Sequence, residues 1–202
     1  IHLCYHDSMS MKRDIAGETL RTPYGEAAFK VVDILSDAGY DTWWVGGCVR
    51  DMLEGHLPKD IDIATTADPN QVLACFEKGK EVPRPLGSVR IKQGKYVFEV
   101  TTFRKESIVS DGRIPESVTY SNRQDDATRR DFTINAMYFH PVSGELFDPF
   151  GGEADLKEKL IRFVGDPGER IRHDALRIMR AVRFSAKIGG QYHPDTYAAL
   201  KE

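Results

Sequence analysis

The stretch "VGGCVRDMLEGHLPKDIDIAT", residues 45–65, places two glycines and an arginine ahead of two aspartates that are one residue apart. Gly46 and Gly47 follow the apolar run "TWWV", which is typical of a buried strand entering a tight turn. Because glycine lacks a Cβ atom, such a turn can bring backbone N–H groups close to a phosphate, with Arg50 one helical turn further on. The alternative is a plain strand-to-helix turn in which Arg50 pairs with a neighbouring acid.

The two aspartates alternate with apolar residues in "DIDIAT". In a strand, Ile61 and Ile63 then share one face, while Asp60 and Asp62 share the other. Paired carboxylates suit hard divalent cations, although such pairs are also common as solvated charge. Glu99 in "YVFEVTTF" supplies a third acid if the two strands are neighbours. Three converging carboxylates can hold two magnesium ions for an in-line phosphoryl transfer, so we predict Asp60, Asp62 and Glu99 as catalytic and the two aspartates as metal ligands.

A cationic helix is predicted from Asp174 onward. At 100° per residue its apolar arc, expected to pack, contains Ala175, Ile178, Met179, Val182 and Ala186. The opposite arc contains Asp174, Arg177, Arg180, Arg183 and Lys187. Arginines at this spacing repel each other unless an anion lies among them, and Arg129 and Arg130 are candidates to face the same anion. A solvated charged face is the alternative.

The remaining pattern predicts a mixed α/β fold of the α+β kind, with a small mixed sheet and flanking helices. Helices are expected at 26–38 and 68–78, and hairpins at 88–103 and around 141–144. The polar stretch 104–120 is expected to be a mobile loop. We predict an N-terminal tail at 1–25, a head domain at 26–150 and an all-helical part at 151–202.

Composition limits the class of protein. The chain has 202 residues, of which 41% are hydrophobic and 29% charged, as expected of one soluble domain with at most a short appendage. The net charge of −3 means that any nucleic-acid surface must be local. Three cysteines without CxxC spacing argue against a disulfide framework or a zinc site, and favour the cytoplasm. No apolar run approaches the ~20 residues of a membrane span.

Four segments together, in order, resemble motifs of the class II nucleotidyltransferases, the family of CCA-adding enzymes (tRNA nucleotidyltransferases) and bacterial poly(A) polymerases. They are "GGCVRD" with "DID", then "RRDFTINA", "DPFGG" and "HDALRIMRAVRF". The resemblance implies a catalytic head and a helical neck that selects the nucleotide, followed by domains that hold tRNA. It implies template-independent addition of CMP and AMP from CTP and ATP to the tRNA 3′ end, as CCA or as its terminal A alone, with magnesium. A poly(A) polymerase and a non-catalytic nucleotide-binding module are the alternatives.

Carried over residue by residue, the resemblance implies that Asp60, Asp62 and Glu99 form the metal-binding and catalytic trio. It implies that the nucleotide phosphates are contacted by Gly47, Arg50 and Arg130. The edge of the base would be read by Asp174 and Arg177, and the nucleotide would be supported by Arg180 and Arg183.

Two departures from the family pattern are visible. His173 stands where the family usually has a glutamate, and the chain ends at Glu202 where the family continues with further helices. The first departure predicts a less strict choice of base, because a carboxylate that would orient Arg177 is missing. The sequence predicts no oligomeric state.

Overall fold

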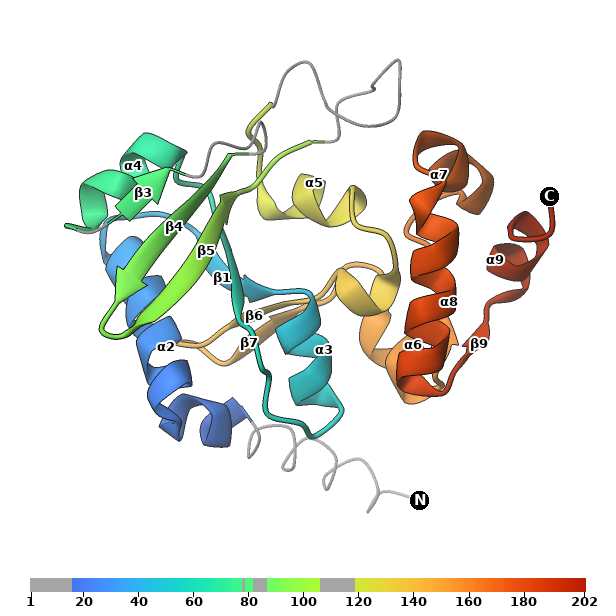
Figure 1. Ribbon diagram of the computed structural model, residues 1–202, viewed down its shortest axis with the longest axis horizontal. Coiled ribbons are helices and arrows are strands. Elements are labelled where there is room, and N and C mark those ends of the chain that lie inside the picture. The colour runs from blue at the N-terminus through green and yellow to red at the C-terminus, as the bar shows by residue number, and fades with distance from the viewer. Residues whose placement is uncertain (1–15, 78, 82–86, 106–118) are drawn as a thin grey trace.

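The computed structural model describes residues 16–77, 79–81, 87–105 and 119–202. Its centre is a seven-stranded sheet in the order β3-β4-β5-β2-β1-β6-β7. Only the β2–β5 pair within this sheet is parallel, and the other neighbours are antiparallel. The predicted mixed α/β fold with a mixed sheet and flanking helices is therefore confirmed (Figure 1).

The sheet strands are β1 (Thr42–Val45), β2 (Asp62–Thr65), β3 (Gly79–Glu81), β4 (Ser88–Gln93), β5 (Tyr96–Thr102), β6 (Tyr138–His140) and β7 (Glu145–Phe147). The helices before and between them are α2 (Pro23–Asp37), α3 (Gly47–Leu53), α4 (Pro69–Cys75), α5 (Arg123–Thr128) and the 3-10 turn η1 (Thr133–Asn135). The C-terminal elements are α6 (Gly152–Lys157), β8 (Leu160–Ile161), α7 (Pro167–His173), α8 (Leu176–Ile188), β9 (Gln191–Tyr192) and α9 (Pro194–Ala199).

Local signals explain where α4 begins and where the hairpin turns. The Asp68 side chain caps α4 by accepting a hydrogen bond from Gln71 N at 2.9 Å, and Asp68 N donates to Gln71 Oε1 at 2.9 Å, which completes a capping box. The hairpin between β4 and β5 turns at Gly94, whose φ of +62° lies in the left-handed region that glycine tolerates. The sequence predicted the helix over 68–78 and the hairpin over 88–103, and it did not predict the capping box.

One hydrophobic core joins the sheet to the C-terminal helices. Val32 and Leu35 of α2 are fully buried, as the helical pattern predicted. The same cluster continues through Phe132 to Phe163 and Phe184, and the ring centroids of Phe132 and Phe163 are 4.7 Å apart. The helices α7, α8 and α9 gather at one side of the molecule, away from the β3–β4–β5 edge (Figure 1).

The prediction of an all-helical part at 151–202 is wrong in one respect. The short strands β8 and β9 pair in parallel as a separate two-stranded sheet, with Leu160 opposite Gln191. Each strand has only two residues, too few for the period-2 pattern to stand out from the helical one. Backbone pairing between segments thirty residues apart is a tertiary effect that local sequence does not reveal.

Three other predictions concern the N-terminal tail, the polar loop and membrane-spanning segments. Residues 16–21, expected within the tail, are helical, and Thr19 is buried. Most of the predicted loop 104–120 lies outside the described residues, so its mobility stays a prediction. No helix in the described part of the chain combines the length and apolar character needed to cross a membrane.

Candidate functional site

The three predicted catalytic acids lie on two adjacent strands. The parallel pairing of β2 with β5 sets Ile63 opposite Val100, so Asp62 and Glu99 are neighbours across the pair. Asp60 lies just before β2, and both aspartates are exposed while Ile61 and Ile63 are buried. The alternation expected from "DIDIAT" is thus present, and the acids share one end of the strand pair.

The acids influence one another electrostatically. Burial of the Asp62 carboxyl group raises its pKa. The positive charge of Arg130 opposes this rise, and the negative charges of Glu99 and Asp60 add to it. Although the Asp62 residue is exposed, the protein atoms around its carboxyl group remove part of its hydration. A cation placed among these carboxylates would relieve their repulsion, and their oxygens suit a hard divalent metal.

The carboxylates do not form a ready-made metal cage. Among the residues that the structure describes, no three His, Cys, Asp or Glu side chains are grouped closely enough to hold a metal ion. The donor set fits a divalent metal by its chemistry, but in the described structure Asp60, Asp62 and Glu99 are not grouped closely enough to hold one metal ion together.

The glycine turn lies against Arg130. Gly46 has φ +72°, and its N–H donates to Met137 O at 3.1 Å. A Cβ atom at Gly46 would lie 3.0 Å from Nη1 of Arg130, a tight contact that would press against this guanidinium, and the positive φ also favours glycine. The charge of Arg130 also acts on Asp62. The turn, Arg130 and the strand that carries Asp62 therefore meet at one place.

Arg130 is held by a buried network that the sequence did not predict. Asp126 is fully buried and accepts hydrogen bonds from Arg130 Nη2 at 3.1 Å and from the Tyr138 hydroxyl at 2.7 Å. Arg130 Nε donates to Tyr138 Oη at 2.8 Å, and Arg129 Nε donates to Asp126 at 2.8 Å. Although burial alone raises it, the pKa of Asp126 is held below its usual value by the two arginines. The charged sequence "NRQDDATRR" is typical of an exposed helix, so the sequence gives no sign that Asp126 is buried and holds Arg130.

Arg50 is buried and already paired. Its Nη2 lies 2.7 Å from Asp51 Oδ1, as the structural alternative predicted, and its Nη1 donates to Asn135 Oδ1 at 2.5 Å. Only 3% of Arg50 is exposed, so little of its guanidinium is accessible to a phosphate in this structure. Gly47 is close to it, because a Cβ there would lie 3.6 Å from Arg50 Nη2.

Helix α8 packs with a different face from the one predicted. Its buried residues are Arg177, Ala181, Phe184 and Ile188. Two members of the predicted packing arc, Met179 and Val182, are 67% and 50% exposed. Residues 181, 184 and 188 also follow helical spacing, so α8 carries two apolar stripes, and the pattern alone could not show which one faces the core.

Phe184 gathers three of the predicted nucleotide-binding arginines. The guanidinium carbons of Arg50, Arg180 and Arg183 lie 5.2, 5.5 and 5.7 Å from its ring centroid. Arg180 also forms an ion pair of 2.5 Å with Asp131, which ties α8 to the "RRDFTINA" segment. Arg180 and Arg183 of α8 therefore converge with Arg50 around an aromatic ring, an arrangement that the sequence did not predict.

The two predicted base-reading residues have structural partners. Asp174 ends α7 and accepts a hydrogen bond from Leu176 N at 3.0 Å. Arg177 is 7% exposed and donates to Arg170 O at 3.0 Å, while Arg170 in turn donates to Arg130 O at 2.7 Å. His173, the departure from the family pattern, is exposed. The base-reading role of this pair stays a prediction.

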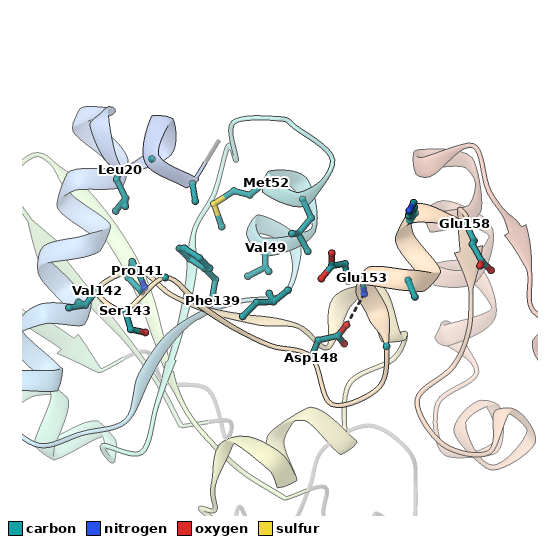
Figure 2. Close-up of a pocket in the computed structure, with 18 residues that line it drawn as sticks. Leu20, Val49, Met52, Phe139, Pro141, Val142, Ser143, Asp148, Glu153 and Glu158 are labelled. Carbon is teal, nitrogen blue, oxygen red and sulfur yellow. Dashed lines mark hydrogen bonds between the residues drawn. The ribbon is translucent and has the colours of Figure 1, made fainter. Parts of the chain in front are cut away.

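A larger pocket lies away from the acids. It has a volume of about 980 Å³, with Leu20, Val49, Met52 and Phe139 among its apolar lining residues (Figure 2). At its edge Asp148 of "DPFGG" accepts hydrogen bonds from Gly152 N and Glu153 N, which fixes the start of α6. No predicted site residue lines this pocket, so its size does not mark it as the reaction site.

Comparisons with known proteins agree with this geometry. The family model for the poly A polymerase head domain matches residues 42–162. The CCA-adding enzyme of Oceanobacillus iheyensis is 45% identical over 174 residues, which are 86% of this chain and 43% of that protein. That of Geobacillus stearothermophilus is 42% identical over 182 residues, 90% of this chain and 45% of that protein.

Solved structures are similar as well. The crystal structure of the Bacillus stearothermophilus CCA-adding enzyme in complex with CTP has a TM-score of 0.79 and 40% identity, and the match covers 88% of this chain and 43% of that one. The Thermotoga maritima CCA-adding enzyme complexed with tRNA has a TM-score of 0.74 and 26% identity, with coverage of 94% and 44%. The chain spans about half the length of the relatives it matches.

Proposed function

This chain belongs to the poly A polymerase head domain family, and from that premise we propose that it is the catalytic part of a tRNA nucleotidyltransferase. The reaction would be template-independent addition of CMP and AMP to the tRNA 3′ end from CTP and ATP. The name CCA-adding enzyme, carried by relatives at 42% to 45% identity, supports this choice of substrate. Four short sequence motifs indicate the same family.

The observation that carries the proposal is the meeting of opposite charges at the end of the β2–β5 pair. Asp62 and Glu99 are neighbours across the two strands, and the charge of Arg130, whose guanidinium lies against Gly46, acts on Asp62. Nucleotidyl transfer requires carboxylates that bind metal ions and a cationic side chain that binds phosphate, held close together.

In the reaction, the RNA 3′ oxygen forms a bond to the α-phosphorus of the nucleotide while the bond to pyrophosphate breaks. The hydroxyl proton leaves to water. Gly47 and Arg50 would hold the phosphates at the turn, and Arg130 would offset the charge that gathers on the departing pyrophosphate. Asp126 and Tyr138 keep the Arg130 guanidinium pointing toward the turn.

Enzymes of this family use divalent metal ions, and we propose magnesium as the metal here. Asp60 and Asp62 would hold it, with Glu99 completing the acid trio. Bound magnesium would activate the attacking oxygen and stabilise the leaving one. The oxygen-only donor set favours magnesium over softer metals.

The direct test offers tRNA transcripts that end before CCA, after C and after CC, each with labelled CTP or ATP. The products are sized by gel electrophoresis. A CCA-adding enzyme completes each transcript and stops. Long adenylate tails on all transcripts would instead identify a poly(A) polymerase, and nucleotide binding without pyrophosphate release would identify a non-catalytic module.

Base selection is proposed to depend on Asp174 and Arg177, with Arg180 and Arg183 supporting the nucleotide. Asp174→Ala should weaken discrimination of ATP from GTP by ~1–3 kcal/mol, as for a good bidentate base contact. Arg183→Ala should weaken the binding of all four nucleotides about equally, which makes this variant the matched control. His173→Glu should tighten selection if a carboxylate there orients Arg177. A uniform loss across four nucleotides in Asp174→Ala would show that α8 does not read bases.

A further inference from the structure

Arg50, which we place on the nucleotide phosphates, already has an anionic partner in this structure. Its Nε and Nη2 atoms both donate to Asp51 Oδ1, at 3.1 and 2.7 Å, and its Nη1 atom donates to Asn135 Oδ1 at 2.5 Å. A phosphate binds the same guanidinium N–H groups that the Asp51 carboxylate now uses. Asp51 therefore competes with the nucleotide for Arg50.

Asp51 has a second cationic partner, which comes from the last turn of α8. Lys187 Nζ lies 3.0 Å from Asp51 Oδ1 and 3.4 Å from Asp51 Oδ2, and the two residues are 136 positions apart in the sequence. Phe184, one helical turn before Lys187, is buried, and its ring centroid lies 5.2 Å from the Arg50 guanidinium carbon. The packing of α8 beside Arg50 thus brings Lys187 to Asp51, and this carboxylate bridges Arg50 and Lys187.

The charge of Asp51 bears directly on phosphate binding. Although burial alone raises it, the pKa of Asp51 is held below its usual value by hydrogen bonds from Arg50 and Lys187, so the carboxyl group is ionised at neutral pH. An ionised carboxylate beside a phosphate site repels the incoming anion unless a cation offsets its charge. Lys187 is placed to do this, because its ammonium group contacts both oxygens of Asp51.

Resting on the proposed function, we propose that Lys187 is a positioning residue for the phosphate site, which retains the Asp51 carboxylate when Arg50 exchanges that carboxylate for a nucleotide phosphate. In this exchange Arg50 replaces one anionic partner with another, and Asp51 keeps a cation. Lys187 acts through Asp51 and does not itself contact the nucleotide. Helix α8 would then serve phosphate binding as well as the proposed choice of base.

The test is a double-mutant cycle on the dissociation constants of CTP, ATP and inorganic triphosphate, measured by isothermal titration calorimetry. Lys187→Gln leaves Asp51 to Arg50 alone. All three ligands should then bind about fivefold more weakly, a modest loss because the Lys187 and Asp51 side chains are 42% and 24% exposed. In an Asp51→Asn background the competing charge is absent, and Lys187→Gln should change the three dissociation constants by less than about twofold.

The matched control is Lys157→Gln, which removes the same charge from an exposed residue of α6 and should leave all three dissociation constants unchanged. Wild-type affinity in Lys187→Gln would overturn the proposal, as would an equal loss in Lys157→Gln. A loss of the same size in the Asp51→Asn background would also overturn it, because Lys187 would then act on the phosphates without Asp51.

Inorganic triphosphate separates this role from a purely structural one, because it has no base. If Lys187 only holds α8 in place for base selection, Lys187→Gln should weaken CTP and ATP and spare triphosphate, and that result would refute the proposal. The proposed function is tested separately. A wild type that binds triphosphate but adds no nucleotide to tRNA would contradict the proposed function, whereas the cycle would still decide the role of Lys187.

Discussion

Asp126→Asn is the substitution with the largest expected effect on both stability and nucleotide use. The Asp126 side chain is fully buried, and it pairs with Arg129 at 2.6 Å and Arg130 at 3.1 Å. Asparagine keeps the shape but removes the charge, which leaves two arginines beside a neutral partner. Breaking a buried pair costs about 3–5 kcal/mol. Because the arginine side chains are 19% and 18% exposed, we expect the lower end, about 3 kcal/mol.

The assay is urea unfolding followed by circular dichroism. With a slope of about 2 kcal/mol/M, this loss lowers the unfolding midpoint by about 1.5 M. Since the pKa of Asp126 is held low, its stabilisation is present above the unfolded pKa of about 3.9 and is lost as pH falls through the folded pKa. The difference between wild type and variant should therefore shrink in acid.

The same variant should raise the KM for CTP, because Arg130 loses the carboxylate that orients it. Asp125→Asn is the matched control, since Asp125 is the preceding residue and pairs with the exposed Lys105 instead of either arginine. Its effect on both readouts should be smaller. A change of less than about 1 kcal/mol for Asp126→Asn, with an unchanged KM, would refute the view that this network positions Arg130.

Two further outcomes are expected. Gly46→Ala should destabilise the protein by about 1–2 kcal/mol and raise the KM for nucleotides, because its φ of +72° strains an alanine and a Cβ meets Arg130. Melting and steady-state kinetics measure both effects, and a fully active, equally stable variant would contradict the role of the turn. Burial raises the pKa of Cys48 to about 12, so its thiol stays protonated at neutral pH. Iodoacetamide should therefore modify the partly exposed Cys75 and spare Cys48, as peptide mass spectrometry can show, and rapid labelling of Cys48 would count against this burial.

The sequence predicted most elements near the site because their signals are local. The run "TWWV", the alternation in "DIDIAT" and the Asp68 cap each depend on residues within one turn or strand. Placing Glu99 beside Asp62 required an assumption about strand order. The parallel β2–β5 pairing supplies it, and no local pattern could.

The partners of the arginines could not be predicted from sequence. Asn135 bonds Arg50 across 85 residues, and Asp131 bonds Arg180 across 49. A helical wheel treats Arg177 as a surface cation, whereas the structure buries it against the Arg170 carbonyl. Burial of a charged side chain depends on acceptors from other elements, which sequence spacing does not place.

The central claim is that Asp60, Asp62 and Glu99 carry out nucleotidyl transfer with magnesium. The most direct measurement is single-turnover incorporation of labelled CMP into tRNA lacking CCA, comparing wild type with Asp62→Ala at saturating magnesium. Loss of a metal ligand removes several kcal/mol of transition-state stabilisation, so the rate should fall by about a thousandfold or more while the variant still unfolds cooperatively. A rate near that of wild type in Asp62→Ala would contradict the claim.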